Sequence, residues 1–142
     1  MDPSQYHNQY RKNAISTSSQ GRLIIMMYEG AIKFTTMAIQ SIDKGDIAGQ
    51  GKYISKTHDI ISELSLALDM KKGGEVALRL ESLYQYMLNQ LTIANIKSDR
   101  KTLENIIKIL SPLNKAWDEV FHASTNTEEG GRESAKRIAS QC

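Results

Sequence analysis

The sequence predicts an all-α protein: an antiparallel up-down four-helix bundle, with a short N-terminal arm or helical turn before it and a flexible C-terminal tail after it. Apolar residues recur every three or four positions through four long segments, and short turns containing glycine or aspartate separate these segments. Strand signals are weak, because the chain has only two valines and no alternation of apolar and polar residues. We expect the arm over residues 1–16, the bundle over residues 17–122 and the tail over residues 123–142.

The first predicted helix starts near Ser18 or Ser19, since either hydroxyl can accept a hydrogen bond from a free backbone N–H of the first turn. Its apolar residues extend over more than one face: Leu23, Ile25, Met27, Ile32, Phe34, Ala38, Ile39 and Ile42. A helix that is apolar over so much of its circumference is either central or covered by another element.

The second predicted helix follows a turn at Gly45 and Asp46. Gly45 suits the left-handed conformation that ends a helix, and the carboxylate of Asp46 suits the start of the next one. Its apolar seam comprises Ile47, Ile54, Ile61, Leu64 and Leu68. We expect this helix to run to about Met70 and to end at residues 71–74, with the two lysines there near the negative end of the helix dipole.

The third and fourth predicted helices are separated by Ser98 and Asp99. The third starts near Glu75, and its seam comprises Val76, Leu80, Leu83, Met87, Leu91 and Ala94. The fourth carries Leu103, Ile106, Ile107, Leu110, Leu113, Trp117, Val120 and Phe121. Pro112 lies within it and removes one backbone hydrogen bond, so we expect a bend there.

Composition indicates a cytosolic protein. The formal net charge of +2 provides no broad basic field for nucleic acid or an anionic membrane. The single cysteine, Cys142, cannot form an internal disulfide, which is typical of a reducing compartment. The longest apolar run, Leu23 to Tyr28, is too short to cross a bilayer, and the polar N-terminus has no secretory signal core. We therefore expect neither nucleic-acid binding nor membrane insertion.

No residue pattern indicates catalysis, a cofactor or a metal site. His58 is the best candidate for a reactive group, but it lacks the lysine and glycine that follow the histidine in phosphotransfer bundles. Glu119 and His122 have the Glu-x-x-His spacing of di-metal bundles, yet no second copy of the pattern occurs. We expect no enzymatic activity.

An excess of apolar residues lies outside the simplest helical seams. Its members are Tyr53, Ile60, Tyr86, Ile93 and Ile109. One interpretation is a generous core or a dimer face, and the other is a groove that receives a helix of a partner protein. The pattern by itself favours neither.

Several ordered elements make the sequence similar to the FliS family of flagellin export chaperones. The third helix contains Gly73-Gly74-Glu75-Val76-Ala77 and Leu83-Tyr84-Gln85-Tyr86-Met87, and the first contains Met27-Tyr28-Glu29-Gly30-Ala31. Tyr10 and the pair Ala116-Trp117 also fall where the family has such residues, and the resemblance covers roughly residues 6–121. The sequence departs from the family pattern at Gln20, at Gln85, where aspartate is usual, and at Asn89-Gln90.

The resemblance implies a cytosolic chaperone that binds the disordered C-terminal region of flagellin, prevents premature polymerisation and assists delivery to the export apparatus. It also implies contacts with the export gate and other flagellar proteins, and no cofactor. We expect partner binding at the five off-seam residues and at Tyr10, which the family motif supplies. The arm, which carries Tyr6, Tyr10 and Ile15, is either a plug for an unoccupied groove or a frayed terminus.

Two other functions are compatible with a helical bundle. A histidine phosphotransfer module would use His58 as the phosphate acceptor. A self-associating structural bundle, for example a homodimer, would use the off-seam apolar residues to bind its own copy.

Overall fold

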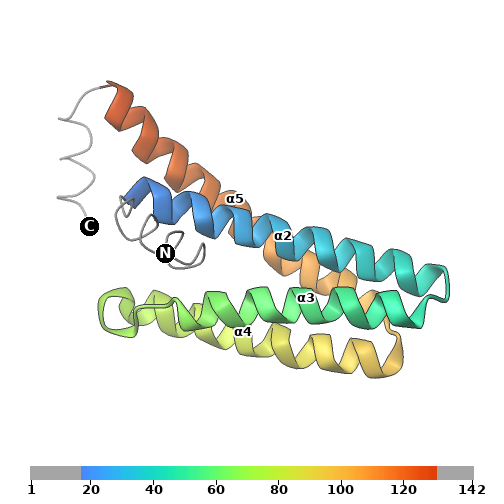
Figure 1. Ribbon diagram of the computed structural model, residues 1–142. Coiled ribbons are helices and arrows are strands. Elements are labelled where there is room, and N and C mark those ends of the chain that lie inside the picture. Colours follow the sequence, from blue (N-terminus) through green and yellow to red (C-terminus); the bar gives the residue numbers. More distant parts are fainter. Residues whose placement is uncertain (1–16, 131–142) are drawn as a thin grey trace, which may run out of the picture. The chain divides into compact units, whose positions relative to one another are not determined.

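The computed structural model describes the backbone of residues 17–130 and the side chains of residues 20–122 (Figure 1). This part of the chain contains no strand, and the all-α prediction is confirmed. Its elements are α2 (Thr17–Asp43), α3 (Ile47–Leu66), α4 (Met70–Lys97) and α5 (Arg100–Gly130). The predicted arm over residues 1–16 and the end of the predicted tail lie outside the described residues.

The chain divides into two compact units, although we expected one bundle from residue 17 to residue 122. The larger unit is formed by residues 26–114. The smaller unit contains residues 17–25, at the start of α2, and residues 115–130, at the end of α5. The boundaries of arm, bundle and tail therefore stay predictions.

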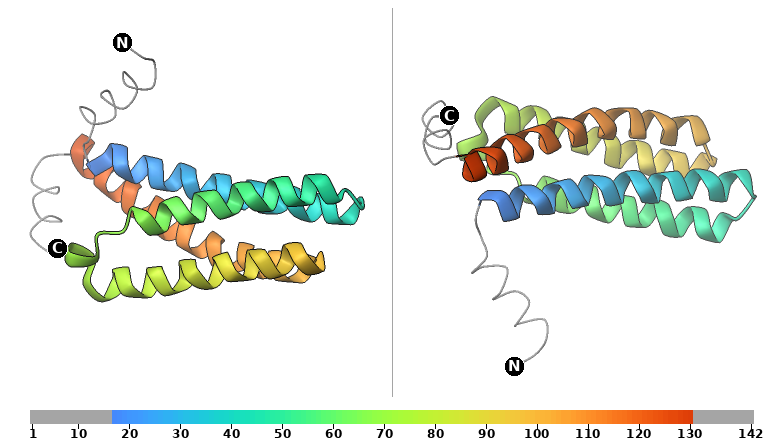
Figure 2. Two further views of the ribbon diagram at one scale, coloured as in Figure 1. Left: turned by 60° about the horizontal axis from the view of Figure 1, so that its bottom comes forward. Right: turned by 90° about the horizontal axis from the view of Figure 1, so that it is seen from above.

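The larger unit is the predicted up-down bundle. Its segments of α2, α3, α4 and α5 run alternately in opposite directions and are joined by short turns (Figures 1 and 2). Short turns leave consecutive helices antiparallel neighbours, as in other bundles of this kind. Within residues 17–130, no helix is both long and apolar enough to span a lipid bilayer.

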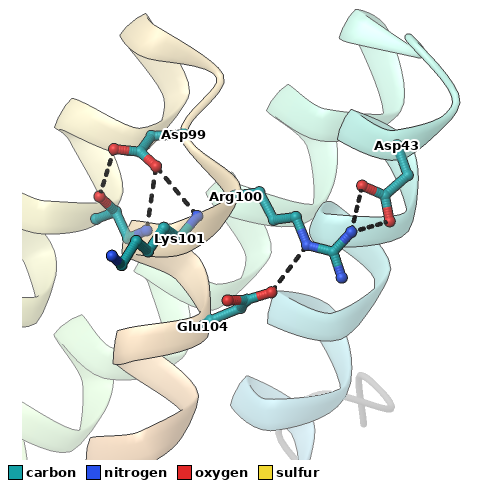
Figure 3. Close-up of polar contacts among 6 residues, drawn as sticks. Asp43, Asp99, Arg100, Lys101 and Glu104 are labelled. Carbon is teal, nitrogen blue, oxygen red and sulfur yellow. Dashed lines mark hydrogen bonds and ion pairs between the residues drawn. The ribbon is translucent and has the colours of Figure 1, made fainter.

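Two turns form as their residues predict. Gly45 has a left-handed φ of 70°, and the Asp46 carboxylate accepts a 2.9 Å hydrogen bond from the backbone N–H of Gly49 at the start of α3. Ser98 ends α4 in the left-handed region, with a φ of 49°. Asp99 then accepts hydrogen bonds from the backbone N–H groups of Lys101 and Thr102 at the start of α5 (Figure 3).

The turn between α3 and α4 differs from the prediction. α3 ends at Leu66, and the carboxylate of Asp69 accepts hydrogen bonds from the backbone N–H groups of Lys71 and Lys72. The two lysines therefore begin α4, and our assignment of them to the negative end of the preceding helix is wrong. Asp69 is an N-cap within a run whose apolar spacing continues, which is why the period alone misplaced the boundary.

A kink at Gly74 separates the first turn of α4 from the rest of that helix. Its φ of 54° and ψ of −133° fall in a region that is essentially restricted to glycine. The long regular part of α4 therefore starts at Glu75, as predicted. Val76, which follows, is 67% exposed, so its assignment to the buried seam is wrong.

α5 continues to Gly130, beyond the end that we expected at His122. Extending an existing helix requires no new nucleus, and the residues before Gly130 include alanine and two glutamates, which are tolerated in helices. Pro112 lies inside α5, and the bend that it predicts stays a prediction.

The core of the larger unit contains predicted seam residues from all four helices, whereas other members of these seams are half-buried or exposed. Its largest fully buried members are Tyr28, Thr35, Thr57, Ile61, Tyr84, Met87, Leu91, Leu103, Ile106 and Leu110. Burying each large apolar side chain contributes about 1.5–3 kcal/mol before the entropy of ordering is subtracted. Ile47, predicted in the seam of α3, is instead 76% exposed, because it occupies the first position of the helix.

Several polar contacts connect the helices of the larger unit. The buried amide of Gln50 on α3 donates to the backbone carbonyl of Asn95 on α4, and its oxygen accepts from the Ser98 hydroxyl. At the surface, Arg100 on α5 forms ion pairs at 2.8 Å with Asp43 of α2 and with Glu104 (Figure 3). Exposed pairs of this kind contribute about 0–1 kcal/mol each.

In the smaller unit, the start of α2 packs against the end of α5. A methyl group at the Cβ position of Gly21 would lie 3.3 Å from the ring of Phe121. His122 lies 3.2 Å from the carboxylate of Asp118, one turn earlier on α5.

Candidate partner-binding surface

Several of the residues that carry the sequence resemblance lie in the core of the larger unit. Tyr28 on α2 and Tyr84 on α4 are both buried, and their hydroxyl oxygens are 2.5 Å apart. Ala31, in the same motif as Tyr28, and Met87, in the same motif as Tyr84, are fully buried. The two motifs therefore meet inside the bundle, where Tyr28 and Tyr84 hold α2 against α4.

The phenol of Tyr84 stays neutral over the whole physiological pH range. Burial raises its pKa far above the ordinary value, and the hydrogen bond with Tyr28 raises it further. Tyr84 is 2% exposed, so its phenol is not accessible to a substrate from solvent. Its role is to fix α4 against α2.

Tyr53 and Ile60 lie on the side of α3 that faces α2. The ring of Tyr53 stacks on the ring of Phe34 with centroids 6.2 Å apart and an interplanar angle of 16°. The Cδ1 atom of Ile60 lies over Gly30, since a methyl group built at the Cβ position of this glycine would come within 3.3 Å of it. Both predicted site residues are half-buried and already have neighbours on α2.

Two lysines of α3 cover the stacked rings. The ammonium group of Lys52 lies 5.4 Å from the centroid of the Tyr53 ring, and that of Lys56 lies 5.2 Å from the centroid of the Phe34 ring. Each cation–π contact contributes about 0.5–1 kcal/mol at an exposed site. We call the following set the α2–α3 face: Gly30, Phe34, Lys52, Tyr53, Lys56 and Ile60.

Sequence reasoning missed Phe34, Lys52 and Lys56 as parts of this surface. Phe34 was assigned to the apolar stripe of the first helix, and nothing in that stripe marks one ring as an outer member. The two lysines are four residues apart, so they lie one above the other on a helix. That spacing, next to a tyrosine, is the signal that could have found them.

Tyr86 and Ile93 lie on another side of α4, which we call the α4 outer flank. The side of α4 that faces α3 is marked by Glu81, which accepts a 2.5 Å hydrogen bond from Ser65 of α3. Tyr86 is five residues after Glu81, about 140° further around the helix. Its side chain is 52% exposed, whereas that of Ile93 is half-buried.

Ile109 is half-buried on α5. Glu104 lies on the same side as Arg100, which reaches α2, and Ile109 is about 140° around α5 from Glu104. Tyr10, the sixth predicted site residue, lies outside the described residues. Of the five described site residues, two belong to the α2–α3 face, two to the α4 outer flank and one to α5.

The residues that we considered for catalysis or metal binding are not brought together. His58 is half-buried on α3, and no group of three or more histidine, cysteine or acidic side chains in the part of the chain that the structure describes is placed to hold a metal ion. Glu119 and His122 lie in the last part of α5 with exposed side chains.

Comparison with known proteins relates the sequence to one family over most of its length. A family model described as "Flagellar protein FliS" matches residues 2–124. The chain is 34% identical over 119 residues to a flagellar secretion chaperone FliS of Vibrio cholerae serotype O1, and the alignment covers 82% of this chain and 88% of the relative.

Two further relatives carry the same description. The chain is 34% identical over 110 residues to the flagellar secretion chaperone FliS of Salmonella typhimurium, covering 77% of this chain and 82% of that protein. It is 28% identical over 121 residues to the one of Bacillus subtilis, covering 85% and 90% of the two chains.

Proposed function

Because this chain belongs to the FliS family, we propose that it is a flagellar secretion chaperone whose client is flagellin. In this proposal it binds the C-terminal region of newly made flagellin in the cytosol, prevents premature polymerisation and assists delivery to the export apparatus. Contacts with the export gate and with other flagellar proteins belong to the same proposal. The role requires binding and release alone, so we propose no catalytic step.

The proposal has a physical basis in what the client must hide. A flagellin segment that builds a helical filament exposes an apolar stripe while it is monomeric, and covering that stripe removes the surface used in polymerisation. Folding such a segment on a partner buries about 1,000–3,000 Å² and loses roughly 2–5 kcal/mol or more to ordering. Apolar burial at about 25 cal/mol per Å² must supply the difference.

The observation that supports this function best is the exposure of Tyr86 beside the half-buried Ile93 on the α4 outer flank. Tyrosine is among the residues that dominate binding energy at protein interfaces, because its ring is large and loses little entropy on binding. Tyr84, two residues earlier, is buried, so the same helix is anchored on one side and offers an aromatic ring on the other. A partner helix can use such a flank by the helix-in-groove mode.

Titration calorimetry with full-length chaperone and flagellin tests the function. We expect binding with a clearly negative heat-capacity change, because apolar surface is removed from water. Flagellin that lacks its last helical segment should not bind. A heat-capacity change near zero, or equal binding of the truncated flagellin, would contradict the proposal.

Light scattering on the same samples tests the homodimer alternative. A chaperone with a free binding surface should be monomeric at the concentrations used for calorimetry and should form a complex of defined mass with flagellin. A tight dimer that flagellin does not dissociate would instead support a self-associating structural bundle.

A further inference from the structure

The α2–α3 face combines an aromatic surface with two cations that have no anionic partner among the described residues. Phe34 and Tyr53 are half-buried and stacked, so part of each ring faces solvent. The ammonium groups of Lys52 and Lys56 lie over these rings. Both lysine side chains are exposed, and in the described part of the chain neither forms an ion pair within 4.0 Å.

The positive charges of Lys52 and Lys56 are not balanced by a carboxylate within ion-pair distance in the described part of the chain. Lys52 and Lys56 are one helical turn apart on α3, and like charges at that spacing repel one another. The acidic residues that follow on the same helix, Asp59 and Glu63, are exposed and make no ion pair with either lysine. A ligand that brings carboxylates to this position relieves the repulsion while its apolar atoms contact the rings.

Resting on the proposed function, we infer that the α2–α3 face binds a helical segment of the client that carries two carboxylates one turn apart beside its apolar stripe. The carboxylates accept hydrogen bonds from the ammonium groups of Lys52 and Lys56. The apolar side chains pack on Phe34, Tyr53 and Ile60. This site is separate from the α4 outer flank, and it selects the register of the client helix by charge.

Charge complementarity identifies the occupant as an acidic amphipathic helix. Two cations spaced by one turn match two side chains at positions i and i+4 of a neighbouring helix, which are about 5–6 Å apart. A purely apolar helix would bury the two ammonium groups without a partner, which is unfavourable. A basic helix would be repelled.

The test compares two lysine pairs in the full-length chain. K52Q/K56Q removes the proposed contact, and K71Q/K72Q removes the same charge from an exposed pair at the start of α4. The probe is the C-terminal segment of flagellin, titrated by calorimetry at about 50 mM and about 300 mM salt, since screening shortens from roughly 14 Å to below 6 Å over that range. Thermal unfolding followed by circular dichroism verifies that each variant is folded.

We expect K52Q/K56Q to weaken binding about tenfold at the lower salt concentration and by less at the higher one. The control K71Q/K72Q should remain within about twofold of the unsubstituted protein. K52R/K56R keeps both the charge and the ring contact, so it should restore the affinity. If K52Q/K56Q and the control behave alike at both salt concentrations, the inference is overturned.

A second set of measurements uses the client side. Pairs of acidic residues one turn apart in the flagellin segment are replaced by glutamine or asparagine, one pair at a time. One pair should lower the affinity for the unsubstituted chaperone but not for K52Q/K56Q, which is the signature of a direct contact. If lysine substitution weakens binding and no acidic pair shows this coupling, recognition of carboxylates is wrong.

The two proposals fail in different ways. If the unsubstituted protein does not bind the flagellin segment at all, the proposed function and this inference are both overturned. If it binds with a negative heat-capacity change but without the lysine dependence, the chaperone function stands and the acidic-helix inference falls.

Discussion

The α2–α3 face and the α4 outer flank both contain apolar residues that fall outside the simplest helical seams, yet the bundle treats them differently. On the α2–α3 face, Tyr53 stacks on Phe34 and Ile60 covers Gly30, so each has an intramolecular neighbour. On the flank, Tyr86 remains 52% exposed. An apolar residue outside a seam therefore does not by itself indicate a surface that is free to bind a partner, because a neighbouring helix can cover it.

This difference has energetic consequences that separate stability from binding. Residues of the α2–α3 face contribute to the packing of α2 on α3 and are available to a client only through their outer edges. Tyr86 is 52% exposed and should contribute little to folding, so under the proposed function its ring can contact a partner at small cost to the fold. Substitutions in the two regions should accordingly move the free energy of unfolding and the client affinity by different amounts.

The largest expected effect on stability belongs to the α2–α3 face. Tyr53→Ala removes the ring from Phe34 and should lower the free energy of unfolding by about 2–3 kcal/mol, somewhat less than for a fully buried aromatic residue. Tyr86→Ala should lower it by less than about 0.5 kcal/mol, because its ring has half its surface in water. Urea denaturation followed by circular dichroism measures both, and equal losses would contradict the distinction.

The free energy of unfolding at alkaline pH tests the burial of Tyr84 on α4. In the unfolded chain Tyr84 loses its proton near pH 10, whereas burial keeps it protonated in the folded protein. The folded state then binds more protons than the unfolded state, so stability is complete below pH 10 and falls by up to about 1.4 kcal/mol per pH unit above it.

Urea denaturation at pH 9, 10 and 11 measures this slope. Tyr84→Phe cannot titrate at this position and should show a shallower decline. An equal slope in both proteins would mean that another group is responsible.

The α4 outer flank should dominate binding. Tyr86→Ala is expected to weaken the affinity for the C-terminal segment of flagellin about tenfold, or about 1.4 kcal/mol, as for an aromatic residue at an interface. Gln85→Ala is a matched control, since Gln85 is an exposed neighbour on the same helix. Calorimetry on both variants is the measurement, and an unchanged affinity for Tyr86→Ala would remove the flank from the client site.

The smallest expected effect concerns the contact between Gly30 and Ile60. Gly30→Ala gains helix propensity of about 1 kcal/mol, but its methyl group would lie 3.3 Å from Ile60 Cδ1. Because that atom is the end of a flexible, half-buried side chain, a small shift should absorb the contact and leave stability within about 0.5 kcal/mol. A loss of more than about 2 kcal/mol in the free energy of unfolding would show that the packing of Ile60 against α2 cannot adjust to the added methyl group.

Local sequence signals predicted most of the helix boundaries. Gly45 with Asp46, and Ser98 with Asp99, end one helix and cap the next as their side chains and backbone preferences require. The end of α3 was misplaced because Leu68 and Met70 continue the apolar period, while Asp69 already caps α4. The boundary between α3 and α4 is therefore set by the capping hydrogen bonds of Asp69 and not by the apolar period.

The surroundings of the candidate partner-binding residues were predicted less completely than the fold. Periodicity places Tyr86 outside the seam, and the structure exposes it. The same argument placed Tyr53 and Ile60 outside the seam, without revealing that Phe34 and Gly30 of α2 lie against them. Tyr10 stays a prediction, since it lies outside the described residues.

The sequence by itself determined the helices, most of their turns and the family, because each depends on residues that are close along the chain or on ordered motifs. Tertiary structure decided which off-seam residues are covered, because the distance between α2 and α3 is set by packing across many residues. It also brought Tyr28 against Tyr84 and placed Lys52 and Lys56 over an aromatic pair. Such contacts join positions whose separation in the chain carries no local signal.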